Sequence, residues 1–183
     1  AGVIVGGEMD GRRVTVNPLV TCMTCDACKA GRVNLCPNRE IISMMPREGA
    51  FAQFITIPDS NLVTVPDDIP LSKAALAEPL AVSWHAARLA LEALHPSMAK
   101  RALVIGGGAI GLAAALALKA MGANDVTIAE PNEARRAYLN KTCGQTTLAK
   151  ADGQFEIVID AVGYAATRAA ASACAMPGGV IPD

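Results

Sequence analysis

The chain has 183 residues, and its 16 Lys and Arg residues nearly balance its 17 Asp and Glu residues. A net charge this close to zero gives no strong field to attract a phosphate backbone or an acidic membrane surface. Aromatic residues make up only 3% of the chain, so it offers little stacking surface for single-stranded nucleic acid. We therefore expect neither nucleic acid nor a membrane as a partner, and the length fits one large domain or two small ones.

Short β-branched segments dominate the chain up to about residue 70. They predict strands at residues 3–5, 13–16, 51–57 and 62–65, separated by clusters of Gly, Pro, Asn and Asp. This pattern favours an irregular β domain. Because the sequence opens directly on a strand-like segment without Met and stops as another apolar run begins, we expect a fragment of a longer chain.

An alanine-rich pattern around Ser72 predicts helices in the middle of the chain. Ser72 can cap the first of them, and Glu78 directly precedes Pro79. Proline disfavours helical geometry in the residue before it, so we expect a break at Glu78 and a second helix from Pro79 to about residue 94. The Glu78 carboxylate would then lie at a junction between helices.

Strands alternate with helices from residue 101 onward. We expect strands at residues 102–105, 126–129, near 146, at 155–160 and at the C-terminal end, and helices at residues 110–121, 133–140 and 167–174. This alternation predicts an α/β fold with a doubly wound parallel sheet, covered by helices on both faces. The uncharged segment 102–118 is interrupted by three glycines and is shorter than the ~20 residues a membrane span needs, so we expect it to be buried in the protein.

Four of the six cysteines lie in one short loop with the spacing C-x2-C-x2-C-x7-C, at Cys22, Cys25, Cys28 and Cys36. Four thiolates can complete the tetrahedral coordination of a structural zinc ion. An iron–sulfur cluster is the alternative, although the ferredoxin pattern places its last cysteine after a shorter gap. The sequence has no recognisable signal peptide, so we expect a reducing compartment, the cytoplasm, where metal binding is favoured over disulfides.

A glycine-rich segment, G-x-G-x-x-G, follows the predicted strand 102–105 and opens the next predicted helix. Gly106 would permit the tight turn, Gly108 would let the backbone approach a pyrophosphate, and Gly111 would let the helix pack closely on the strand. With Ile110 they are our candidate cofactor-binding residues here, because the helix N-terminus would face the phosphates. Simple close packing in a doubly wound sheet is the alternative explanation of the glycines.

An acidic residue, Glu130, closes the next predicted strand about twenty residues further on, as expected for dinucleotide binding. Its carboxylate can accept hydrogen bonds from both hydroxyls of the adenosine ribose, whereas a 2′-phosphate there would bring two negative groups together. This favours NAD over NADP. Arg135 and Arg136 complicate the prediction, because a nearby arginine can accommodate the 2′-phosphate; Arg135 could instead lie over the adenine.

The two motifs together resemble the zinc-dependent medium-chain alcohol dehydrogenase family. The cysteine spacing and the flanking Gly31 and residues 34–36 match its structural-zinc lobe, although the family usually has Gly where this chain has Met23. The resemblance implies part of a GroES-like domain at residues 1–80, with its zinc-binding loop at 22–36. It also implies part of a Rossmann NAD-binding domain at residues 81–183.

The resemblance extends to the candidate reaction site. Residues 158–163 are similar to the strand and turn that pass beside the nicotinamide in these enzymes, which implies a cofactor contact at Val162. In the family, most ligands of the catalytic zinc come from sequence that would precede Ala1. Glu78 resembles the glutamate that the polyol branch places at or beside that metal, and we name it as the catalytic and metal-binding candidate. A helix-boundary acid satisfied by backbone donors is the alternative explanation of Glu78.

These implied features predict an enzyme that transfers hydride from a secondary alcohol, such as a polyol or sugar alcohol, to NAD. The implied cofactors are zinc and NAD, the partner is a small-molecule alcohol, and the resemblance also implies a homo-oligomer. The present chain, without the other zinc ligands, is expected to be inactive alone. Two alternatives remain: an NADP-dependent aldehyde or enone reductase of the same superfamily, and a non-catalytic zinc-stabilised module that binds dinucleotide.

Overall fold

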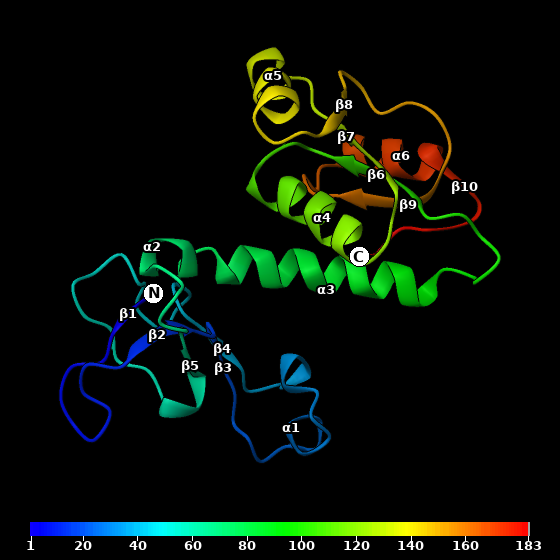
Figure 1. The fold of residues 1–183 in the computed structure, drawn as a ribbon. Coiled ribbons are helices and arrows are strands. Elements are labelled where there is room, and N and C mark those ends of the chain that lie inside the picture. Colours follow the sequence, from blue (N-terminus) through cyan, green and yellow to red (C-terminus); the bar gives the residue numbers. More distant parts are fainter. Residues whose placement is uncertain (183) are drawn as a thin grey trace. The chain divides into compact units, whose positions relative to one another are not determined.

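The computed structural model describes residues 1–182, and the chain forms two compact units (Figure 1). The first unit spans residues 1–77 and the second begins at Glu78. Each has its own sheet, so each is described by itself. The assignment of the two halves to partial domains at residues 1–80 and 81–183 stays a prediction.

The first unit is built on small antiparallel sheets and short helical turns. Its three-stranded sheet has the order β1-β2-β5, and β3 and β4 form a separate two-stranded ladder. The elements are β1 (Gly2–Val3), β2 (Arg13–Val16), β3 (Leu19–Val20), α1 (Asp26–Lys29), η1 (Val33–Leu35), β4 (Glu40–Ile41), η2 (Asp59–Asn61), β5 (Leu62–Thr64) and α2 (Leu71–Ala74). The expected irregular β character is confirmed.

The strand expected at residues 51–57 is not formed. Phe51 and Phe54 are exposed, and no strand ladder in the described part of the chain includes this segment. A run of apolar and β-branched residues gives a strand only where a neighbouring strand can pair with its backbone N–H and C=O groups. The two-residue strands β3 and β4, in contrast, were not expected, because so short a segment carries no readable alternation.

Asn61 fixes the chain that leads into the cysteine loop. Its side chain is buried, and Nδ2 donates hydrogen bonds to the carbonyl oxygens of Asn17 at 2.9 Å and Leu19 at 2.8 Å. The backbone N–H of Asn17 donates in return to the Asn61 carbonyl at 2.8 Å. The start of β3, which precedes the first cysteine, is therefore anchored to the turn before β5.

The expected break at Glu78 is wrong. Helix α2 ends at Ala74 and helix α3 (Ala77–Ala93) already includes Glu78 and Pro79 in its first turn. The first N–H groups of a helix have no acceptor within it, so proline is tolerated there and the break falls earlier, at residues 75–76. Ser72 is likewise inside α2 and does not cap it.

The second unit contains one parallel sheet of five strands in the order β10-β9-β6-β7-β8. Its further elements are β6 (Arg101–Ile105), α4 (Ala109–Ala120), β7 (Asp125–Ala129), α5 (Glu133–Lys141), β8 (Thr146–Leu148), β9 (Phe155–Asp160), α6 (Ala165–Cys174) and β10 (Ala175–Val180). The predicted α/β fold is confirmed. The strand order reverses direction beside β6, and open sheets of this kind bind ligands at the carboxyl ends of the strands next to such a reversal.

Helices cover both faces of this sheet, as its buried strands require (Figure 1). Ala102 and Val104 belong to a core that includes residues of α3, α4 and α5. Leu103 and Ile105 alternate with them and belong to a second core that includes residues of α6. The two-residue period of β6 therefore explains why a continuous apolar run is buried on both sides.

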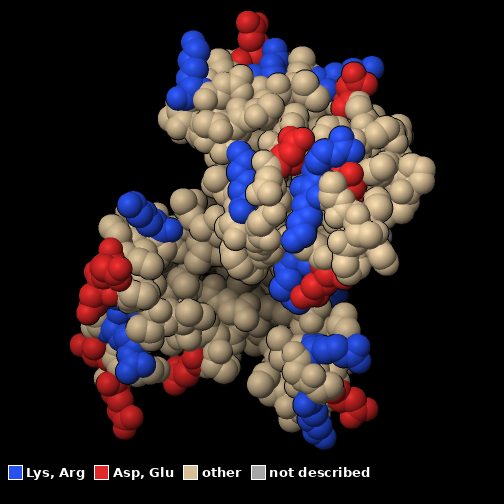
Figure 2. Space-filling model, turned by 45° about the vertical axis from the view of Figure 1, so that its right-hand side comes forward, with Lys and Arg blue, Asp and Glu red and all other residues tan. Residues whose placement is uncertain are grey.

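Basic and acidic side chains are intermixed over the face of the molecule that Figure 2 displays. No helix within residues 1–182 combines the length and the apolar character that crossing a membrane requires.

The close approach of α4 to the end of β6 depends on Gly111. A methyl carbon at this position would lie 1.8 Å from the carbonyl oxygen of Gly106 and 3.4 Å from Cγ1 of Val104. The first distance is far inside van der Waals contact with a backbone atom that cannot rotate away. Glycine at residue 111 is thus required for α4 to begin directly over the strand end.

We expect the substitution Gly111→Ala to lower the free energy of unfolding by about 3 kcal/mol, because the backbone must shift to remove the clash. Urea denaturation followed by circular dichroism measures the change. Gly108→Ala is the matched control, since a methyl group at Gly108 would have nothing within 4 Å. Equal midpoints for the two variants would contradict the packing role of Gly111.

Candidate functional site

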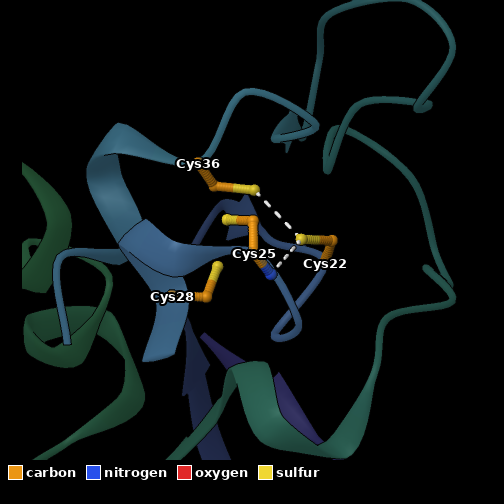
Figure 3. Close-up of side chains that lie close together, drawn as sticks. All are labelled: Cys22, Cys25, Cys28 and Cys36. Carbon is orange, nitrogen blue, oxygen red and sulfur yellow. Dashed lines mark hydrogen bonds between the residues drawn. The ribbon is translucent and has the colours of Figure 1, made fainter. Parts of the chain in front are cut away.

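The four cysteines of the loop converge on one point (Figure 3). The sulfur atoms of Cys22, Cys25, Cys28 and Cys36 all lie within 4.8 Å of one another, and no other cluster of potential metal ligands occurs among residues 1–182. All four thiols are free, and the Cys22 and Cys36 sulfurs are 3.6 Å apart, much farther than a disulfide bond. The cluster can hold a zinc ion.

Short helical turns bring the thiols together. Cys25 precedes α1, Cys28 lies within it, and Cys36 directly follows η1. Gly31, just past the end of α1, has a φ of +74°, the left-handed conformation in which helices commonly end. Cys28 and Cys36 are buried, whereas the other two thiols are partly exposed.

The thiols differ in acidity because their surroundings differ. Hydrogen bonding from Thr24 and from the backbone N–H of Cys25 lowers the pKa of Cys22 to about 5. Burial, with hydrogen bonding to Cys25 and Cys36, raises the pKa of Cys28 to about 11. A bound zinc ion would offset the free-energy cost of burying the Cys28 thiolate, since zinc coordinates thiolates and deprotonates cysteines on binding.

Met23 occupies a left-handed backbone position, with φ of +57°. Its side chain is exposed, and the sulfur accepts a hydrogen bond from Thr21 Oγ1 at 3.2 Å. The position that usually carries Gly in the resembling family therefore does require positive φ here. Met23 is tolerated at some conformational cost, since a left-handed conformation crowds the Cβ of an L-residue.

The glycine segment forms a tight turn between β6 and α4. Gly106 has a φ of +96°, and a methyl carbon there would lie 2.5 Å from Cγ2 of Val162. Gly108 precedes α4 and faces open space. The carbonyl oxygen of Ile110 accepts a hydrogen bond from the buried Ser83 hydroxyl at 3.0 Å, which ties the start of α4 to α3. The open space at Gly108 lies at the N-terminus of α4, where the first N–H groups have no acceptor within the helix.

The Glu130 carboxylate braces this glycine turn. Its side chain is only 3% exposed. Oε2 accepts hydrogen bonds from the Gly107 N–H at 2.9 Å and from Arg135 Nη1 at 3.0 Å. Oε1 accepts one from the Asn132 N–H at 2.8 Å. Burial alone would raise the pKa of Glu130, but these donors hold it below its ordinary value. The group is therefore a carboxylate at neutral pH, with acceptor capacity remaining on Oε1.

The two arginines after Glu130 have different partners. Arg135 is about half exposed and pairs with the Glu130 carboxylate. Arg136 Nη1 donates to the carbonyl oxygens of Glu130 at 2.8 Å and Pro131 at 2.7 Å. Asn132 caps α5 by accepting from the Arg135 N–H at 2.9 Å. Both guanidinium groups are thus engaged at the edge of the candidate ribose site.

Asp160, for which the sequence suggested no role of its own, ends β9 beside the glycine turn. Its Oδ1 accepts hydrogen bonds from the backbone N–H groups of Val162 at 3.0 Å and Gly163 at 3.1 Å, and its Oδ2 accepts one from Thr167 Oγ1 at 2.8 Å. An Asp at a strand end followed by Gly three residues later is the signal that could have identified this turn.

All but one of the predicted site residues fall into two groups. The four cysteines form one cluster, and the glycine segment, Glu130, Arg135 and Val162 gather at the carboxyl ends of β6, β7 and β9. Glu78 belongs to neither group: it is exposed in the first turn of α3 and lies outside the metal-ligand cluster found in residues 1–182. Its role as a metal ligand stays a prediction.

Curated relatives match most of this chain. It is similar to sorbitol dehydrogenase of Bacillus subtilis strain 168, with 39% identity over 130 residues that cover 69% of this chain and 36% of the relative. It is also similar to L-galactonate-5-dehydrogenase of Escherichia coli strain K12, with 40% identity over 130 residues that cover 71% of this chain and 36% of the relative. The match thus spans about a third of the length of either relative.

Solved structures share the fold of nearly the whole chain. Galactitol-1-phosphate dehydrogenase from Escherichia coli superposes with a TM-score of 0.82 and 27% identity, covering 94% of this chain and 52% of that one. A zinc-binding dehydrogenase from Sinorhizobium meliloti 1021, solved with NADP bound, gives a TM-score of 0.83 and 27% identity, covering 97% of this chain and 55% of that one.

Two family models match, one in each half of the chain. The Alcohol dehydrogenase GroES-like domain matches residues 1–67, and the Pyridine nucleotide-disulphide oxidoreductase model matches residues 101–160. The first covers the cysteine cluster and the second covers the glycine turn together with Glu130. With the relatives above, these matches show that the chain belongs to the zinc-dependent medium-chain alcohol dehydrogenase family, in its polyol dehydrogenase branch.

Proposed function

We propose that this chain is part of a dehydrogenase that transfers hydride from a secondary alcohol, of the polyol or sugar-alcohol class, to NAD. The observation that carries the proposal is the buried Glu130 carboxylate, which braces the glycine turn and keeps acceptor capacity for a ribose. The polyol and sugar-acid dehydrogenases among its relatives support the substrate class. The cytoplasm and a homo-oligomer remain part of the proposal, by resemblance.

The cysteine cluster suits a structural zinc ion. Zinc bonds thiolate sulfur at about 2.3 Å, which in a tetrahedron separates the sulfurs by about 3.8 Å. The 3.6 Å between the Cys22 and Cys36 sulfurs and the 4.8 Å limit for the whole set agree with that requirement. Because four thiolates leave no open coordination position, we assign this ion to holding the loop together and not to catalysis.

The second unit would bind the dinucleotide across the end of its sheet. The pyrophosphate would lie against Gly108 and the first turn of α4, where unpaired N–H groups and the helix dipole favour negative charge. Glu130 would hold the adenosine ribose on the β7 side, and Arg135 would cover the adenine edge. The nicotinamide half would extend past Val162 on the β9 side, since β6 lies between β9 and β7. When bound, NAD supplies the hydride acceptor.

A catalytic zinc needs about three protein ligands and an open position. Among the described residues the family resemblance names Glu78, which is exposed in the first turn of α3. We therefore propose only that Glu78 contributes to that metal or to its immediate surroundings, and we derive no catalytic step from it.

An NADP-dependent reductase is the second candidate function. The neighbour solved with NADP and the half-exposed guanidinium of Arg135, a group that can pair with a phosphate, favour this candidate. Against it, a 2′-phosphate beside the buried, ionised Glu130 carboxylate would be repelled, which is why NAD is our first choice.

We expect Cys25→Ser to remove zinc and to lower the thermal unfolding temperature of the full-length protein, because zinc binding energy is also folding energy in such a lobe. Metal analysis and differential scanning calorimetry measure both effects. Cys143→Ser, which changes a thiol outside the cluster, should keep the zinc. Iron in the wild-type protein, or full zinc content in Cys25→Ser, would contradict the assignment.

Gly108→Ala should weaken NAD binding by about tenfold or more, because the methyl group would occupy the space that the pyrophosphate needs, while the stability stays unchanged. Isothermal titration calorimetry measures the affinity, and urea denaturation provides the stability control. Unchanged affinity would show that the dinucleotide does not approach the backbone at this turn.

Glu130→Gln should reduce the preference for NAD over NADP by about tenfold, since the substitution removes the charge that repels a 2′-phosphate. The measurement is kcat/KM with each cofactor for a panel of secondary alcohols. Glu133→Gln, an exposed acid in the first turn of α5, is the control and should leave the ratio unchanged. A wild-type preference for NADP that Glu130→Gln does not alter would favour the reductase instead.

A further inference from the structure

The turn after β9 is attached to the end of β6, directly beside the glycine turn. The Ala161 N–H donates to the Ile105 carbonyl at 2.9 Å, which continues the pairing of β9 with β6 by one residue. Cγ2 of Val162 then occupies the space beside Gly106 that any larger residue at position 106 would need. The turn after β9 and the glycine turn are therefore in direct contact and form one continuous surface.

Asp160 folds this turn back on itself. Two hydrogen bonds to Oδ1 orient the N–H groups of Val162 and Gly163 toward the carboxylate, and Gly163 adopts a φ of +82°. The third, from Thr167 Oγ1 to Oδ2, fixes the carboxylate to the first turn of α6. The Thr167 hydroxyl also accepts from the Tyr164 N–H at 3.0 Å, so strand end, turn and helix are joined through one side chain.

The turn that Asp160 holds lies on the side of the sheet where one half of the cofactor would bind. Glu130 lies on the β7 side of β6 and Asp160 lies on the β9 side, and the glycine turn lies between them. A dinucleotide whose ribose is held at Glu130 and whose pyrophosphate rests on α4 must place its other half over the turn that Asp160 folds. Val162 in that turn is 40% exposed, although its Cγ2 lies beside Gly106.

We propose that Asp160 is a positioning residue for the nicotinamide half of the dinucleotide. This inference rests on the proposed function, and it assigns Asp160 a role through the turn and not through contact with the cofactor. Because the carboxylate accepts all three hydrogen bonds, its removal would release Val162 from its place against Gly106. The adenosine half, held at Glu130, would keep its site.

The test compares two ligands that share the adenosine and pyrophosphate parts, NADH and ADP-ribose, on the full-length protein by isothermal titration calorimetry. For Asp160→Ala we expect NADH to bind about tenfold more weakly and ADP-ribose to bind within about twofold of the wild type. Asp160→Asn, which keeps an acceptor for the turn, should recover most of the NADH affinity. Should the alanine variant fail to fold, Thr167→Val, which removes the hydrogen bond to Oδ2, is expected to weaken NADH binding but not ADP-ribose binding.

The control is Asp152→Ala, an exposed acid in the loop before β9, which should change neither affinity. Equal weakening of NADH and ADP-ribose by Asp160→Ala, or no effect on either, would overturn the positioning role. Absence of ADP-ribose binding by the wild-type protein would instead overturn the proposed dinucleotide site, and the inference with it.

Discussion

The missing side chain of Gly111 is the constraint on which the second unit depends. Because no atom stands between residue 111 and the Gly106 carbonyl, α4 starts directly over the end of β6, and its free N–H groups are presented at the carboxyl edge of the sheet. Glu130 on one side and the Val162 turn on the other both pack against the resulting loop. A single packing requirement thus gathers the parts of the candidate cofactor site.

The cysteine loop of the first unit would depend on metal coordination more than on close packing of apolar side chains. Few large apolar side chains are buried in the first unit, and two of its buried hydrophobic residues are themselves cysteines, Cys28 and Cys36. A loop with so small a core gains little from apolar burial, so coordination of a metal by four thiolates would supply the missing stabilisation. The raised pKa of Cys28 expresses the same point, since burying a thiolate is unfavourable without a cation beside it.

How much the sequence predicted differs between the halves. From residue 101 onward, apolar runs bounded by glycine and helix signals predicted every strand and helix to within a few residues, because buried parallel strands read as continuous apolar segments. In the first half the strand at residues 51–57 failed, since pairing depends on a distant partner. The helix break at Glu78 was misplaced, because a first helical turn tolerates Pro79. The turn after β9 was expected from the resemblance, but the role of Asp160 in it was not, since its three donors become neighbours of the carboxylate only in the folded chain.

The central claim is that one dinucleotide spans the sheet edge from Glu130, over Gly108, to Val162. A crystal structure of the full-length protein with NAD tests it most directly. The account predicts the adenosine ribose within hydrogen-bonding distance of the Glu130 carboxylate, the pyrophosphate at the N-terminus of α4, and the nicotinamide beside the turn after β9. A dinucleotide bound elsewhere, or bound here with its ribose away from Glu130, would contradict it.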